Sequence, residues 1–180
     1  FPFEKSAKIY LTAVSRPPYI YRLSGPEITD FLISERDKEH IANPQIIALF
    51  YYRPLTDPML SHNLYAQERP VYINNFVGIS ISDIKKDTEY HINTVIKNAD
   101  YVLVKSGKRT DMYFSEPNYK VLKGMQQLFD NHIDLAKYYE KKAEFWVYQD
   151  SSTVTIYKRK QTMDQNELKR LQKELIKILE

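Results

Sequence analysis

Nearly continuous apolar runs in this chain alternate with segments whose apolar residues recur at helical spacing. The runs QIIALFYY at 45–52 and DYVLVKSG at 100–107 are typical of strands that are covered on both faces. The run VYINNFVGI at 71–79 predicts a third strand. A further strand is expected at 7–14, AKIYLTAV, because its residues favour extended backbone and the following prolines interrupt any ladder.

Helical patterns separate these runs. Each begins with a residue that caps a helix N-terminus, and these starts are Ser24, Asp57, Ser82 and Ser115. Strands that alternate with helices imply parallel strands joined by right-handed crossovers. We therefore predict a Rossmann-like α/β fold, with a mostly parallel sheet and helices on both faces.

The C-terminal third has a different pattern. Two extended segments, 133–149 and 153–160, flank Asp150, Ser151 and Ser152, whose side chains readily bond to turn backbone, so an antiparallel hairpin is expected. From Asp164 onward, one side of a predicted amphipathic helix carries Leu168, Leu171, Leu175 and Ile178. We predict an α/β domain over 1–160 and a helix over 161–180 that docks on it, rather than lying on a membrane surface.

Composition limits the function classes. The 180 residues, 43% hydrophobic and 27% charged, suit one globular domain. A net charge of +3 is too small to indicate a nucleic-acid binder. No cysteine is present, which excludes disulfides and thiolate metal sites.

No apolar run approaches the ~20 residues that span a bilayer, so the chain as given is expected to be soluble. The 15 tyrosines and 8 phenylalanines favour rings at the core boundary or on a contact surface.

Motifs for catalysis and cofactor binding are missing from the sequence. The histidines stand far apart and form no ligand pair at helical spacing; they are His40, His62, His91 and His132. The chain has no glycine-rich phosphate loop, no dinucleotide fingerprint and no nucleophile elbow. We expect no catalytic residue, no metal and no cofactor.

Polar residues follow the predicted strands at their carboxyl ends, where ligands of parallel sheets usually lie. The candidate ligand-binding residues are Arg53, Asn74, Asn75, Lys105, Lys108 and Arg109. If the strands are neighbours, these side chains line one rim that suits an anionic or hydroxyl-rich group, such as a sugar or a lipid phosphate. A merely solvated edge is the alternative interpretation.

Two segments carry a resemblance to a known family. Residues 99–107 read ADYVLVKSG, and residues 153–159 read TVTIYKR at the end of the hairpin. With the helix between them, they resemble the extracytoplasmic C-terminal domain of membrane glycosyltransferases related to the protein O-mannosyltransferases, where the segments read approximately ADYVVVKTG and PDGSKVYVYKR. The resemblance covers roughly residues 92–160. The sequence Gln-Asp-Ser-Ser at 149–152 stands where the family often has Pro-Asp-Gly-Ser.

The resemblance implies a parent enzyme that transfers a sugar from a polyprenyl-phosphate donor. In that family, catalysis is attributed to an acidic residue between membrane helices, a part that this chain lacks, so no catalytic residue is carried over. The chain is then an inactive platform for an acceptor or a partner on the extracytoplasmic face, and it contacts glycan or lipid-linked sugar but no nucleic acid. A free-standing glycan- or protein-binding module is the main alternative, and a soluble enzyme without a recognisable motif is a third.

Overall fold

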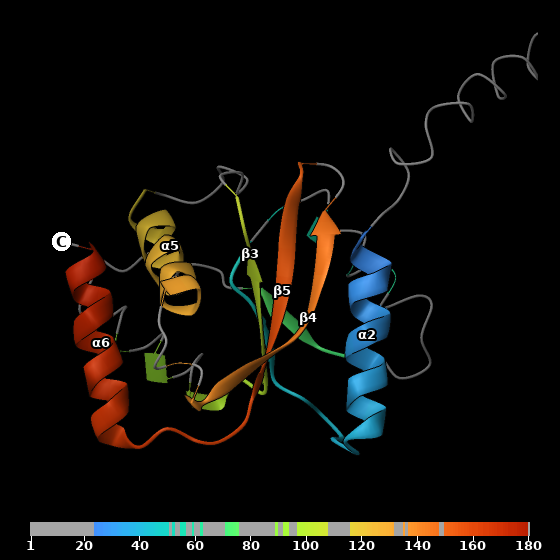
Figure 1. Cartoon of the computed structure of the whole chain (residues 1–180), viewed down its shortest axis with the longest axis horizontal. Helices are drawn as coiled ribbons and strands as arrows, with labels where there is room; N and C mark the ends of the chain where they lie inside the picture. Colours follow the sequence, from blue (N-terminus) through green and yellow to red (C-terminus); the bar gives the residue numbers. More distant parts are fainter. Residues whose placement is uncertain are drawn as a thin grey trace, which may run out of the picture.

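A computed structural model describes the following part of the chain: residues 24–50, 52, 55–56, 59, 62, 71–75, 89, 92–93, 97–107, 116–131, 135, 137–147 and 150–179. Its strands are β1 (Ile46–Ala48), β2 (Ile73–Asn75), β3 (Tyr101–Lys105), β4 (Tyr139–Val147) and β5 (Ser152–Arg159). They form one sheet in the order β2-β1-β3-β5-β4, so β3 lies at its centre (Figure 1).

The sheet is mixed, so the predicted Rossmann-like fold class, which requires a mostly parallel sheet, is wrong. Strand β1 pairs in parallel with β2 and β3, whereas β5 pairs antiparallel with both β3 and β4. A tight turn forces β5 to return antiparallel to β4. The prediction failed because β5, rather than a strand reached by a crossover helix, occupies the second side of β3.

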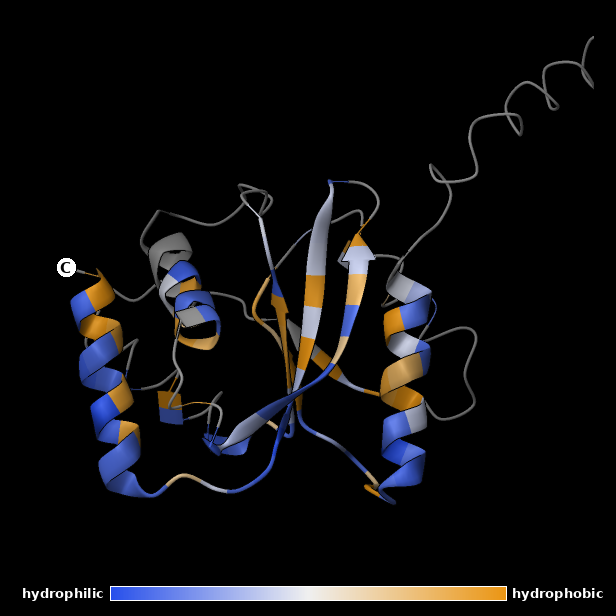
Figure 2. Cartoon of the chain, in the orientation of Figure 1, coloured by the Kyte–Doolittle hydropathy of each residue, from blue (hydrophilic) through white to orange (hydrophobic). Residues whose placement is uncertain are grey.

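The described helices pack against this sheet from two sides. Helix α2 (Ser24–Lys38) lies on one side, and helices α5 (Glu116–Asn131) and α6 (Gln165–Leu179) lie on the other (Figure 1). Hydrophilic residues dominate the outward surface of α6, while apolar residues concentrate along the inner strands (Figure 2). The sheet therefore separates two apolar layers.

Alternation along β3 divides its side chains between these layers. Val102 and Val104 belong to the cluster with α5 and α6, whereas Tyr101 and Leu103 belong to the cluster with α2. All four are buried. This confirms the alternation expected of a central strand whose neighbouring side chains point to opposite faces.

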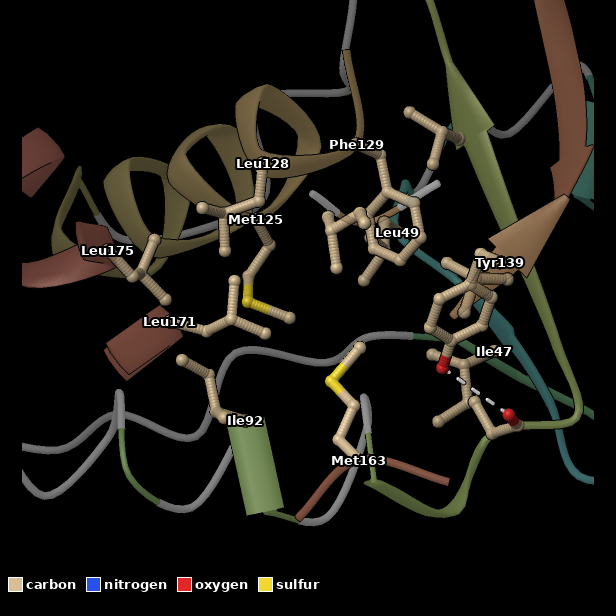
Figure 3. Close-up of a cluster of buried hydrophobic side chains, with 14 of the residues drawn as sticks. Ile47, Leu49, Ile92, Met125, Leu128, Phe129, Tyr139, Met163, Leu171 and Leu175 are labelled. Carbon is tan, nitrogen blue, oxygen red and sulfur yellow. Dashed lines mark hydrogen bonds between the residues drawn. The ribbon is translucent and has the colours of Figure 1, made fainter. Parts of the chain in front are cut away.

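Helix α6 docks on α5 through a buried apolar stripe of Leu168, Leu171 and Leu175. Figure 3 shows Leu171 and Leu175 of this stripe near Met125 of α5. Asp164 caps the helix, since its Oδ1 accepts a hydrogen bond from the Glu167 amide at 2.8 Å. Capping and apolar burial together explain why the helix begins where the sequence pattern predicted.

Other predicted elements fall wholly or largely outside the described residues. The expected strand at 7–14 lies outside them entirely. Of the helices expected from Asp57 and Ser82, the structure describes only isolated positions and the short stretches 92–93 and 97–98. These elements stay predictions.

Candidate functional site

The predicted rim of polar residues is described only in part. Arg53, Lys108 and Arg109 lie outside the described residues. The backbone of Asn75 is level with Ala48 on β1, and Ala48 is level with Leu103 on β3. The C-terminal ends of β2, with Asn74 and Asn75, and of β3, with Lys105, therefore lie at the same end of the sheet. Strand β1 lies between them, so the backbones of β2 and β3 are ~10 Å apart. A ligand-binding role for these residues stays a prediction.

Lys105 is part of a buried ion pair. Its Nζ lies 2.5 Å from Oδ2 of Asp150, and the two side chains are 1% and 4% exposed. The ammonium also lies 4.7 Å from the centre of the Tyr52 ring and donates to the Ser106 carbonyl at 3.4 Å. The other carboxylate oxygen of Asp150 accepts from Ser152 Oγ at 2.6 Å. Lys105 thus ties the end of β3 to the hairpin turn.

A second ion pair joins β3 and β5 at the opposite end. Arg159 donates to Asp100 Oδ1 at 2.6 Å and to the Lys97 carbonyl at 2.6 Å. The second oxygen of Asp100 accepts from the Gln45 amide at 2.9 Å. One carboxylate therefore holds the start of β3, the end of β5 and the entry to β1 together.

A cleft opens beside α5, at the end of the hairpin where β4 begins and β5 ends. Its volume is about 340 Å³, and its lining residues are Phe129, Leu135, Tyr139, Glu140, Lys141, Tyr157 and Lys160. We call it the aromatic cleft. Phe129, Leu135 and Tyr139 are buried and form an apolar floor, while Lys141 and Lys160 are exposed. An apolar wall with a few polar groups at its mouth is the usual construction of a small-molecule site.

The aromatic rings of the cleft hold one another in place. Phe129 packs against Tyr139 edge-to-face with 5.3 Å between ring centres, and against Tyr157 with 5.2 Å between ring centres. Tyr139 also donates to the Ala99 carbonyl at 3.4 Å, the bond that is dashed in Figure 3. Offset and edge-on contacts of this kind favour fixed ring positions, so the walls of the cleft are preformed.

A β-bulge in β4 creates the cleft. The register shifts between Lys141 and Ala143, so that Lys141 stands opposite Tyr157 while Ala143 stands opposite Ile156. Side chains alternate along a strand, and one extra residue moves everything before it to the other face. Without the extra residue, Tyr139 and Lys141 would point toward α2 instead of lining the aromatic cleft.

Charges around the cleft are mostly paired. Lys141 binds Glu144 at 2.6 Å, and Glu140 binds Lys142 at 2.7 Å. Hydrogen bonding by these lysines lowers the pKa of both glutamates. Burial, with Asp130 nearby, raises the pKa of the Tyr157 hydroxyl, and burial also raises that of Tyr139. Both phenols therefore stay protonated over the physiological pH range, and Tyr139 uses its proton in the hydrogen bond to Ala99.

In the described part of the chain, no group of three or more His, Asp and Glu side chains is arranged to hold a metal ion. The helices described there include none that is long and apolar enough to cross a bilayer. The described carboxylates at the two ends of β3, Asp100 and Asp150, are paired with Arg159 and Lys105.

Sequence reasoning missed the aromatic cleft. Two signals point to it in retrospect: the high tyrosine content, and the adjacent lysines in YEKKAEFWV, which break the alternation of β4 at the bulge. Neither signal shows that α5 packs beside the hairpin, since that contact joins residues far apart in the sequence.

The chain was compared with family models, with curated proteins and with solved structures, and no match was found in any of the three.

Proposed function

We propose that this chain is a non-catalytic domain of a membrane glycosyltransferase that uses a polyprenyl-phosphate-linked sugar, where it serves outside the membrane as a platform for an acceptor or a partner. The proposal rests on how the two segments that resemble that family meet. Their strands, β3 and β5, are neighbours, with Tyr101 opposite Lys158 and Lys105 opposite Val154.

The polar residues of the two segments pair with each other, and this observation carries the proposal. Asp100 of the ADY sequence binds Arg159 of the YKR sequence, and Lys105 of the VKSG sequence binds Asp150 of the turn. Asp150 stands where the family has the aspartate of its Pro-Asp-Gly-Ser turn. The pairing of these charged residues supports the proposal because it joins the two resembling segments into one structural unit.

The same pairing supports a role other than catalysis. In both pairs, the carboxylate accepts from a cation and from a further donor: the Gln45 amide for Asp100 and the Ser152 hydroxyl for Asp150. Each of these carboxylates therefore accepts a hydrogen bond at both of its oxygens from groups within the fold. In the proposed parent enzyme, the acid that performs the transfer belongs to the membrane part.

The reading frame around this sequence tests the proposal. We expect it to encode several membrane-spanning helices before Phe1, and we expect the purified 180-residue chain to show no transfer from a polyprenyl-phosphate-linked sugar. Deletion of the domain from the parent protein should reduce transfer while leaving the membrane part able to bind the donor. A start codon or a cleavable signal directly upstream, or turnover by the isolated chain, would overturn the proposal.

The second candidate is a free-standing binding module for a glycan or a protein. The observation that favours it is the aromatic cleft, together with the exposed ring of Trp146 (49% exposed). The same reading-frame experiment separates the two candidates, because a module of this kind has no upstream membrane helices.

A further inference from the structure

We infer that the aromatic cleft and the adjoining open face of the β4–β5 hairpin form a binding site for an uncharged oligosaccharide. This inference deepens the second candidate function, a binding module, by naming the ligand class and the surface, and it needs neither a parent enzyme nor a lipid-linked donor. It is assigned from the geometry of the hairpin and from the charges that surround it.

One face of the hairpin is covered and the other is open. On the side of α2, Val154 and Ile156 are fully buried. The opposite face, which we call the hairpin face, is half-buried or exposed along its length and carries Lys141, Glu144, Trp146, Thr153, Thr155 and Tyr157. Cross-strand partners share a face, so Trp146 beside Thr153 and Lys141 beside Tyr157 belong to one continuous surface.

Aromatic rings stand at both ends of this surface. Tyr157 forms the wall of the aromatic cleft, where Phe129 fixes its ring. Trp146 stands opposite Thr153, four residues from Tyr157 along β5. At ~3.3 Å per residue, the two ends lie ~13 Å apart along the strand. This span suits a short oligosaccharide, whose sugar rings present apolar faces that pack on aromatic rings.

Polar side chains fill the space between the rings. Lys141 and Glu144 form an ion pair whose side chains are 52% and 43% exposed, and Thr155 donates to Glu144 at 3.4 Å. An ammonium donates only, a carboxylate accepts only, and a hydroxyl does both. Neighbouring sugar hydroxyls need this mixture, because each of them both donates and accepts.

The charge balance favours an uncharged ligand over a phosphorylated one. Among the described residues, Lys141 and Lys160 border the cleft, as does Glu140, while Asp130 and Glu144 are close enough to raise the pKa of Tyr157. Positive and negative groups thus roughly cancel. A phosphate site would need an excess of cationic donors directed at one point, which this surface does not provide.

Titration calorimetry on the 180-residue chain tests the inference, with mannotriose, maltotriose and chitotriose as uncharged probes and with mannose 1-phosphate and inorganic phosphate as charged ones. Trp146 is the only tryptophan, so its fluorescence reports directly from the hairpin face. We expect at least one trisaccharide to bind saturably and to change the Trp146 emission, and we expect no binding of inorganic phosphate.

Variants locate the site. Tyr157→Ala should weaken binding about tenfold, which corresponds to ~1.4 kcal/mol, whereas Tyr157→Phe, which keeps the ring, should stay within about twofold of the wild type. Lys141→Ala changes an exposed side chain and should also weaken binding, so the test stands even if Tyr157→Ala fails to fold. Tyr72→Ala removes an exposed ring beside β2, the outer strand on the other side of the described sheet, and serves as the matched control with unchanged affinity.

Three results would overturn the inference: no trisaccharide binds, only phosphorylated probes bind, or binding is unaffected by both Tyr157→Ala and Lys141→Ala. None of these results bears on the reading frame of the parent protein, so failure of this inference is distinguishable from failure of the proposed function.

Discussion

Lys105 and Asp150 face each other across the end of the sheet, with 2.5 Å between Nζ and Oδ2 and almost no contact with solvent. Removing one partner of a buried ion pair leaves the other charge desolvated and unpaired, which costs about 3–5 kcal/mol. We expect Asp150→Ala to lower the free energy of unfolding by this amount in urea denaturation.

The matched control for this ion pair is Glu144→Ala. It breaks the pair between Lys141 and Glu144, which is about half exposed on the same hairpin. Exposed pairs contribute about 0–1 kcal/mol, so the loss should be small. Similar losses for Asp150→Ala and Glu144→Ala would contradict the buried position of Lys105.

Ser151 lies at the tip of the hairpin with φ of 55°, in the left-handed region. A side chain there costs roughly 1–2 kcal/mol relative to glycine, part of which is offset because glycine loses more entropy on folding. We expect Ser151→Gly to stabilise the protein by about 0.5–1 kcal/mol, measured by urea denaturation.

Ser151→Ala is the control for the turn variant. It keeps a Cβ at the strained position and removes only the hydroxyl, so its stability should stay within about 0.5 kcal/mol of the wild type. If glycine and alanine have equal effects, the left-handed conformation at Ser151 is wrong.

The strands and helices of this fold follow from local sequence patterns, whereas the order of the strands in the sheet does not. The alternation of Val102 and Leu103 was predictable, because a buried strand has apolar residues on both faces. The hairpin turn was also recognisable from Asp150 and Ser152. The pairing of β5 with β3 was not, since strand order depends on contacts between residues far apart in the sequence.

For the same reason, the sequence alone did not reveal the role of Lys105 in the candidate site. At the end of a predicted strand, a lysine indicates either an anion-binding rim or a structural ion pair, and the sequence does not say which residue it meets. The structure places Asp150, 45 positions away, beside it. Likewise, the cleft depends on the bulge that turns Tyr139 toward Phe129, and a one-residue change in register is not visible in average hydrophobicity.

Leu103 is fully buried at the centre of β3, in the apolar layer beneath α2. Replacing it with alanine removes apolar contacts and leaves a cavity, at a cost of about 2–5 kcal/mol. Urea denaturation should show this loss, while Ile178→Ala in the last turn of α6, where the side chain is 39% exposed, should cost far less. A loss for Leu103→Ala of less than about 0.5 kcal/mol would place the strand at the periphery of the sheet.

Tyr101 provides a test that depends on pH. Its ring is fully buried, and its hydroxyl has no hydrogen-bond partner within the described part of the chain. Burial, with a smaller contribution from Glu35, raises the pKa of Tyr101 from 10.0 to about 12. The native state therefore keeps this proton at pH values where the unfolded chain has lost it.

The sign of the effect follows from the raised pKa of Tyr101. The contribution of this residue to stability is fully present below pH 10 and is lost as the pH rises through about 12. Tyr101→Phe cannot ionise, so the decline in its unfolding free energy between these pH values should be shallower than in the wild type, by on the order of 1–3 kcal/mol.

At pH 7, the unfolding free energy of Tyr101→Phe should equal or exceed that of the wild type, because the variant no longer buries a hydroxyl that lacks a partner in the described structure. Urea denaturation at pH 7, 10, 11 and 12 gives both readings, with the exposed Tyr72→Phe as the control. If Tyr101→Phe loses more than about 1 kcal/mol at pH 7, the hydroxyl has a partner that stabilises the fold.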